Sequence, residues 1–130
     1  MTPMIKDNET FEVNVYQFVD KKGKESFSLT NDDGTAAELI QGAELKITFK
    51  RPAWGDIKEI MSKSVVMIEG KAQIDPYRLM DTRLKVLIRS WNLTEEDGKP
   101  IPATPENTDR LSPPLADVIN QALMQSGYLD

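Results

Sequence analysis

The sequence predicts an α+β fold: an N-terminal antiparallel β-hairpin plus a third strand, followed by a small bundle of three to four helices. Runs that alternate apolar and polar residues, as half-buried strands do, are confined to residues 1–50. Apolar residues at helical spacing and helix starts marked by proline fill residues 51–130. A chain of 130 residues has room for one modest core, so we expect a single domain.

The predicted hairpin consists of residues 10–19 and 25–30, joined by a turn at 20–24. Both runs alternate apolar with polar residues, which is typical of strands with one buried face. In the second run, this pattern places Phe27 and Leu29 on the same buried face.

The segment after the hairpin contains the clearest strand of the chain. Asn31-Asp32-Asp33-Gly34 is predicted to form a second turn, and residues 36–40 suit either one short helical turn or a connector. Residues 44–50 alternate strictly, and their inward side chains are expected to be Leu45, Ile47 and Phe49.

A first helix is predicted to follow this strand. Proline is tolerated in a first helical turn, and Pro52 is expected there. The apolar residues that recur at helical spacing behind it are Trp54, Ile57, Ile60 and Met61. Residues 62–74 are ambiguous, because Val65-Val66-Met67-Ile68 suits either a buried strand or a continued helix. We favour a mobile or partner-facing loop for this segment.

The best-supported helix begins at Asp75-Pro76, where a capping oxygen precedes proline at the first helical position. Its apolar stripe comprises Met80, Leu84, Leu87 and Trp91, widened by Leu79 and Ile88. The basic residues expected to point away from the stripe are Arg78, Arg83, Lys85 and Arg89.

The stretch from Ser90 to Asn107 is expected to close this helix and to act as a rigid joint. It turns at Asp97-Gly98, continues through an extended Pro100-Ile101-Pro102 connector and opens a new helix at Thr104-Pro105. A last helix begins at Ser112-Pro113 and ends near Gly127. One of its faces carries Leu115, Val118, Ile119 and Leu123.

Composition excludes several classes of activity. The chain contains neither cysteine nor histidine, which removes disulfides, thiolate nucleophiles, imidazole bases and the common zinc sites. The loops at Gly34 and Gly98 lack the acidic residues that an EF-hand calcium loop needs at its ends. The glycines are also too far apart for a phosphate-binding loop. We therefore expect no catalytic site, no metal and no cofactor.

Charge is distributed unevenly along the chain. Residues 44–91 hold ten basic and six acidic side chains, whereas the two flanking segments together hold six basic and fifteen acidic ones. The basic middle is expected either to solvate outer helix faces or to meet an acidic partner segment. Nucleic acid is not an expected partner, because aromatic residues are not interleaved with the basic ones. No apolar run approaches a membrane span and no signal peptide is evident, so an intracellular location is expected.

Two segments carry a resemblance to a known family. They are Leu45-Lys46-Ile47-Thr48-Phe49-Lys50-Arg51-Pro52-Ala53-Trp54-Gly55-Asp56 and the stretch from Ser90 to Leu111, with Trp91-Asn92-Leu93, Asp97-Gly98-Lys99-Pro100-Ile101-Pro102 and Glu106-Asn107. Both resemble segments of the tail assembly chaperones of long-tailed bacteriophages. The resemblance covers roughly residues 45–126 and leaves the N-terminal hairpin without an assigned role.

The resemblance implies a non-enzymatic protein that binds the tape measure protein, a long and mostly helical chain, and keeps it soluble until the tail tube assembles around it. It also implies a location in the host cytoplasm and absence from the mature virion; the tail tube protein and self-association are further options as partners. Adaptable apolar contacts would suit this role, and Met61, Met67, Met80 and Met124 are available for them.

The candidate partner-binding residues lie on the predicted helix faces. They are Trp54, Ile57, Met61, Leu84, Leu87, Trp91, Leu115, Val118, Ile119 and Leu123. The competing interpretation is that the tryptophans and the last stripe belong to the core. Alternative functions are a structural tail or neck component, whose N-terminal hairpin adds strands to a neighbouring sheet, and a small phage-encoded inhibitor of a host protein.

Overall fold

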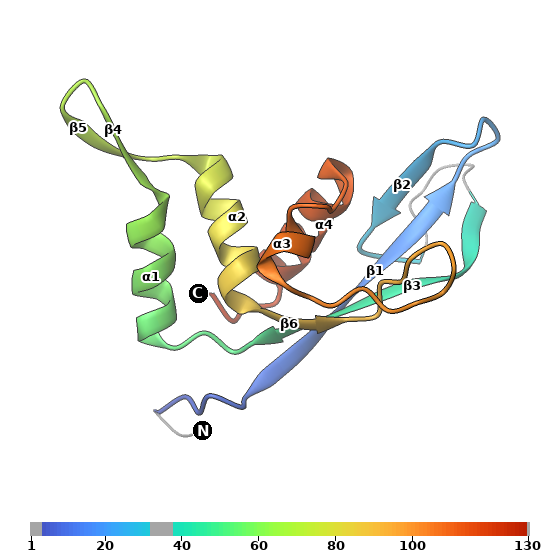
Figure 1. Cartoon of the computed structure of the whole chain (residues 1–130), viewed down its shortest axis with the longest axis horizontal. Coiled ribbons are helices and arrows are strands. Elements are labelled where there is room, and N and C mark those ends of the chain that lie inside the picture. Colours follow the sequence, from blue (N-terminus) through green and yellow to red (C-terminus); the bar gives the residue numbers. More distant parts are fainter. Residues whose placement is uncertain (1–3, 32–37, 130) are drawn as a thin grey trace.

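The fold contains a four-stranded antiparallel sheet with the helices beside it (Figure 1). The structure is a computed structural model that describes residues 4–31 and 38–129. The sheet has the order β2-β1-β3-β6 and consists of β1 (Thr10–Val19), β2 (Glu25–Ser28), β3 (Glu38–Lys50) and β6 (Ile88–Trp91). The helices are α1 (Trp54–Ser64), α2 (Pro76–Leu87), α3 (Pro105–Thr108) and α4 (Pro113–Gln125). A separate hairpin consists of β4 (Val65–Ile68) and β5 (Lys71–Ile74). The predicted α+β class is confirmed.

The inward face of the sheet follows the alternation of the sequence. Phe11 pairs with Phe49, and Val13 pairs with Ile47, so that the odd-numbered residues of 11–15 in β1 and of 45–49 in β3 share one face. Val15, Ile47 and Phe49 are fully buried on that face, and Leu45 is half-buried. The strands predicted over residues 10–19 and 44–50 are therefore confirmed.

The core lies between this face and the helices. It is a single buried cluster that comprises Val15, Ile47, Phe49, Ile60, Leu84, Leu87, Ile88, Leu115, Ile119, Ala122 and Leu123. Because β1, β3, β6, α1, α2 and α4 all contribute to it, the sheet and the helices share a core.

The helix predicted to run through Trp91 ends at Leu87 instead. Ile88 has extended backbone angles, and Ile88–Trp91 continues as β6 along the edge of β3, where Ile88 pairs with Phe49 and Trp91 with Ile47. The apolar spacing could not reveal this change, because Ile88 is buried on the same core as the helical stripe. Pairing with β3 satisfies backbone groups that a continued helix would have satisfied internally.

Three local predictions also need correction. Pro52 precedes α1, since Ala53 is its N-cap residue. Residues 38–40 belong to β3 and are neither a helical turn nor a connector, while residues 36 and 37 lie outside the described residues, as does most of the predicted turn at 31–34. Residues 62–74 are not a loop: α1 continues to Ser64 and the β4–β5 hairpin follows.

The other helix starts are as predicted. The Asp75 carboxylate accepts hydrogen bonds from the backbone N–H groups of Tyr77 and Arg78. Thr104 caps α3 by accepting from Asn107, and proline occupies the first turn of α2, α3 and α4. Within the described residues, none of the helices is both long and apolar enough to span a membrane.

Asp56 ties the start of α1 to the end of β3. Its carboxylate accepts the Ala53 backbone N–H at 2.8 Å and lies 3.0 Å from the Lys50 ammonium. Burial raises the pKa of Asp56, but the hydrogen bond from Ala53 and the charge of Lys50 outweigh it, and the net pKa is lowered.

We predict that Asp56→Asn lowers the free energy of unfolding by about 1 kcal/mol at pH 7. Because the folded-state pKa lies below the ordinary value of 3.8, this stabilisation is present above that pH and is lost as the pH falls through the folded-state value. Urea unfolding from pH 7 to pH 2.5 should show the two proteins converging in acid. Asp117→Asn, on an exposed part of α4, is the matched control, and a difference that persists unchanged at pH 2.5 would contradict the assignment.

Candidate protein-binding surface

The β4–β5 hairpin projects from the ends of α1 and α2 (Figure 1). Its strands are joined by a two-residue turn in which Glu69 and Gly70 both have positive φ, 51° and 78°. This geometry is typical of a type I′ turn, whose twist matches that of the paired strands. At its base, Asp75 donates its backbone N–H to the Ser64 carbonyl at 2.8 Å, which anchors the hairpin between the two helices.

One side of this hairpin is entirely apolar. Val65 pairs with Ile74 and Met67 pairs with Ala72, and residues two apart on a strand point the same way, so these four side chains form one face. We call Val65, Met67, Ala72 and Ile74 the hairpin face. The opposite side is mixed, with Lys71 and Gln73 beside its apolar residues.

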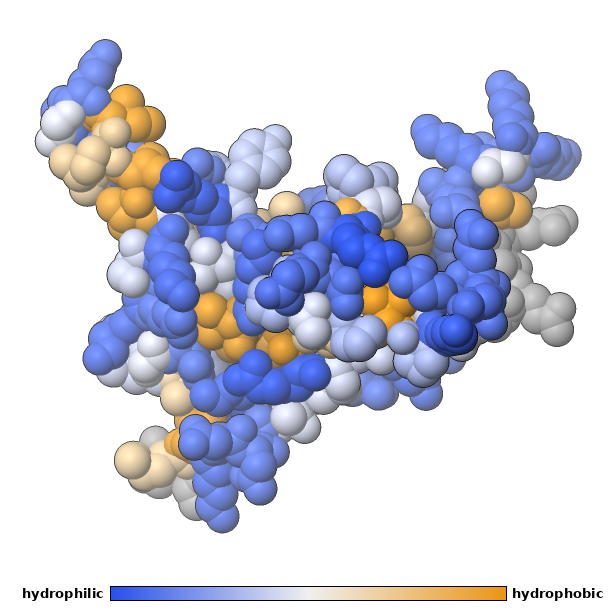
Figure 2. All heavy atoms as spheres, viewed as in Figure 1, coloured by the Kyte–Doolittle hydropathy of each residue, from blue (hydrophilic) through white to orange (hydrophobic). Residues whose placement is uncertain are grey.

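The hairpin face is open to solvent. Met67 is 67% exposed, Ile74 42% and Val65 39%. Figure 2 shows hydrophobic atoms gathered on the projecting hairpin. An isolated two-stranded hairpin is only marginally stable in water, and exposed apolar patches mark sites of association. The hairpin face therefore has the properties of a contact surface for another protein.

The outer side of α1 exposes two further large apolar side chains. Trp54 is 72% exposed, and Met61, two turns further along the helix, is 43% exposed. The interpretation of Trp54 as a core residue is therefore wrong. Ile57 is half-buried between them, and Ile60 faces the core.

The remaining predicted partner-binding residues do not gather on this surface. Five of them are buried in the core: Leu84, Leu87, Leu115, Ile119 and Leu123. Val118 and Trp91 are half-buried against that core. Among the described residues, the sequence reasoning missed most of the hairpin face, although the uninterrupted run Val65-Val66-Met67-Ile68 signalled it.

A groove lies between α1, α2 and the C-terminal segment that contains Met124 and Leu129. It has a volume of about 120 Å³ and is lined by Ile57, Ile60, Met61, Leu79, Arg83, Met124 and Leu129. Arg83 was expected to point away from the apolar stripe, but it is half-buried and lines this groove. Burial lowers the pKa of its guanidinium below the ordinary value.

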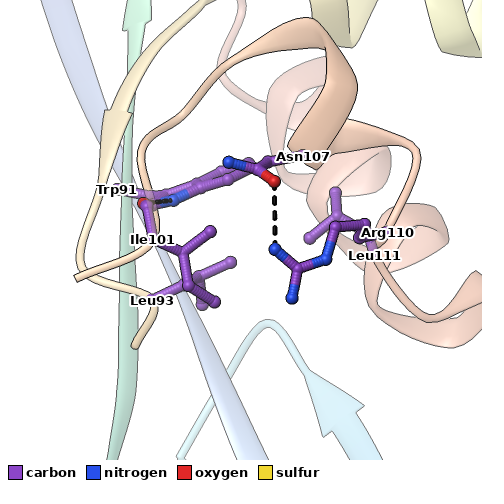
Figure 3. A pocket seen from close by; sticks show the side chains of 6 residues that line it. All are labelled: Trp91, Leu93, Ile101, Asn107, Arg110 and Leu111. Carbon is purple, nitrogen blue, oxygen red and sulfur yellow. Dashed lines mark hydrogen bonds between the residues drawn. The ribbon is translucent and has the colours of Figure 1, made fainter. Parts of the chain in front are cut away.

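A second pocket, of about 80 Å³, is lined by Trp91 together with residues of the connector and α3 (Figure 3). The Trp91 indole N–H donates to the Ile101 carbonyl at 2.6 Å, which fixes the proline connector against β6. The Asn107 side chain donates to the Pro102 carbonyl and accepts from Arg110, which also pairs with Glu95. These contacts give the stretch from Ser90 to Asn107 the role of a joint that positions α3 and α4.

The two segments that carry the resemblance have structural roles in this fold. Asn92 accepts the Lys46 backbone N–H at 2.8 Å and donates to the Glu44 carbonyl at 3.0 Å, so its side chain extends the pairing of β6 with β3. Arg51 forms an ion pair with Glu9 at 3.0 Å and lies over the Tyr128 ring.

No group of three or more potential metal ligands occurs within the part of the chain that the structure describes. No protein-family model, curated protein or solved structure matches this chain.

Proposed function

We propose that this chain is a non-enzymatic phage tail assembly chaperone that binds the tape measure protein and keeps it soluble in the host cytoplasm until the tail tube assembles around it. The observation that supports this most directly is the exposed hairpin face. A chaperone must offer apolar surface to a partly apolar client without losing its own solubility, and a short hairpin rimmed by charged residues meets both needs.

The chemistry of the exposed side chains also suits a long client with many similar segments. Met61 and Met67 have flexible, polarisable side chains that adapt to differently shaped partners. Trp54 adds a large aromatic surface, which is a favoured anchor at interfaces. The surface therefore favours tolerant binding of apolar segments.

Co-expression with tape measure fragments tests this function. We expect fragments that are insoluble alone to appear in the soluble fraction when the chain is present, and to co-purify with it. Bovine serum albumin added at the same concentration to refolding fragments controls for general crowding. Fragments that remain equally insoluble with and without the chain would contradict the proposal.

A structural tail or neck component is the second candidate, and one observation favours it. Within the described residues, β4 and β5 each leave one edge unpaired, and such edges can add strands to a neighbouring sheet. The N-terminal hairpin can take this role only through β2, which lies at the end of the four-stranded sheet, because β1 is paired on both sides. Mass spectrometry of purified virions separates the candidates: a chaperone is expected to be absent, and a structural component present in fixed copy number.

A further inference from the structure

The groove between α1 and α2 combines apolar walls with a cation, Arg83, that has no partner among the described residues. Met61, Leu79 and Met124 supply apolar surface, and Arg83 lies among them. Within residues 4–31 and 38–129, the Arg83 guanidinium forms no hydrogen bond and no ion pair. A half-buried cation without a partner has lost part of its hydration with no compensating interaction.

Within the described residues, the neighbouring carboxylates do not pair with Arg83. Asp81, two residues before Arg83 on α2, pairs with Lys85, and Glu59 on α1 pairs with Lys63. Lys58 is exposed, forms no ion pair within the described residues and shares a helix face with Trp54 and Met61. Arg83 therefore leaves one positive charge in the lining of the groove that no described carboxylate pairs with.

The size of the groove indicates what it accepts. Its volume of about 120 Å³ falls below the roughly 300–1,000 Å³ of small-molecule sites, so it suits individual side chains of a larger partner. A groove between two helices joined by a hairpin is a common seat for an amphipathic helix, which inserts apolar residues spaced three or four apart.

We propose that this groove binds an amphipathic helix that presents an apolar ridge and, beside it, a carboxylate that pairs with Arg83. This inference rests on the proposed function and specifies the client segments as acidic amphipathic helices. The carboxylate gives the contact a direction, because Arg83 lies on the α2 side of the groove and not on the α1 side.

Designed peptides test this pairing. The probe is an 18-residue amphipathic helix with a leucine ridge and a single Glu beside it; its counterpart carries Lys at that position. Fluorescence anisotropy is expected to show that the wild-type chain binds the Glu peptide about tenfold more tightly than the Lys peptide, and that Arg83→Glu reverses this preference. Lys21→Glu makes the same charge change in the distant β1–β2 turn and should leave the preference unaltered.

Thermal unfolding of each variant verifies that the fold is retained, and Arg83→Met, which keeps apolar contact but removes the charge, should bind both peptides equally. Equal binding of the two peptides by the wild-type chain, or no binding of either, would overturn the inference. A second result would also overturn it: the wild-type chain sediments as a dimer, and Met61→Lys converts it to a monomer. A second copy of this chain would then occupy the groove. If the Arg83 variants solubilise tape measure fragments as well as the wild-type chain does, the chaperone function is retained but the groove is not its binding site.

Discussion

Replacing Met67 and Ile74 together by serine should abolish the solubilising effect on tape measure fragments while leaving the fold intact. The two side chains lie on the hairpin face, exposed to solvent and outside the core. Burying a fully exposed side chain of this size is worth about 1.5–3 kcal/mol, and Met67 is 67% and Ile74 42% exposed, so the double change is expected to weaken binding by about tenfold to a hundredfold. Titration of labelled tape measure fragments measures the loss.

The same hairpin provides the matched control. Lys71 and Gln73 lie on its opposite side, at neighbouring positions of the same strand, and their double replacement by serine should leave binding close to wild type. Circular dichroism is expected to show unchanged helix content in both variants. If the Met67 and Ile74 variant solubilises the fragments as well as the wild-type chain does, the hairpin face is not the contact surface.

Residues 10–19 of β1 and residues 44–50 of β3 could be predicted as strands because they alternate between a solvent-exposed face and a buried face. Alternation identified Ile47 and Phe49 as inward residues, and their pairing with β1 is what the pattern requires. The helix starts were equally accessible, since a capping oxygen followed by proline is a local signal. Asp75 and Thr104 cap α2 and α3 as that signal predicts.

Two elements escaped prediction, one because it depends on a distant strand and one because of its turn sequence. Ile88–Trp91 forms a strand because β3 offers an edge, and nothing local distinguishes it from the end of an apolar helix. The β4–β5 hairpin lacks the Asn-Gly or Asp-Gly turn that usually marks such hairpins, since Glu69 takes a positive φ ahead of Gly70.

The candidate site was predicted only in part, for a related reason. Apolar spacing identifies a helix face but does not say whether another element covers it. Leu84 and Leu123 are covered, whereas Trp54 and Met61 are not, although all four lie on apolar helix stripes. The covering of a face depends on tertiary packing, which the pattern does not contain.

Phe49→Ala should lower the free energy of unfolding by about 3–5 kcal/mol, a large part of the total for a domain of this size. Phe49 is fully buried, pairs with Phe11 across β1 and β3, and pairs with Ile88 of β6. Its ring stacks on Phe11 with centroids 5.6 Å apart. Truncation therefore leaves a cavity where three strands meet, and urea denaturation followed by circular dichroism should show a lower midpoint.

Trp54→Ala is the informative comparison, because it removes a larger aromatic side chain from the same motif. Trp54 is 72% exposed, so the expected change in the free energy of unfolding is within about 0.5 kcal/mol. A loss as large as that of Phe49→Ala would place Trp54 in a core and would contradict its assignment to the surface. If instead Trp54→Ala leaves the free energy of unfolding unchanged and weakens binding of tape measure fragments, the Trp54 side chain contributes nothing to folding. Its large aromatic surface then contacts another molecule.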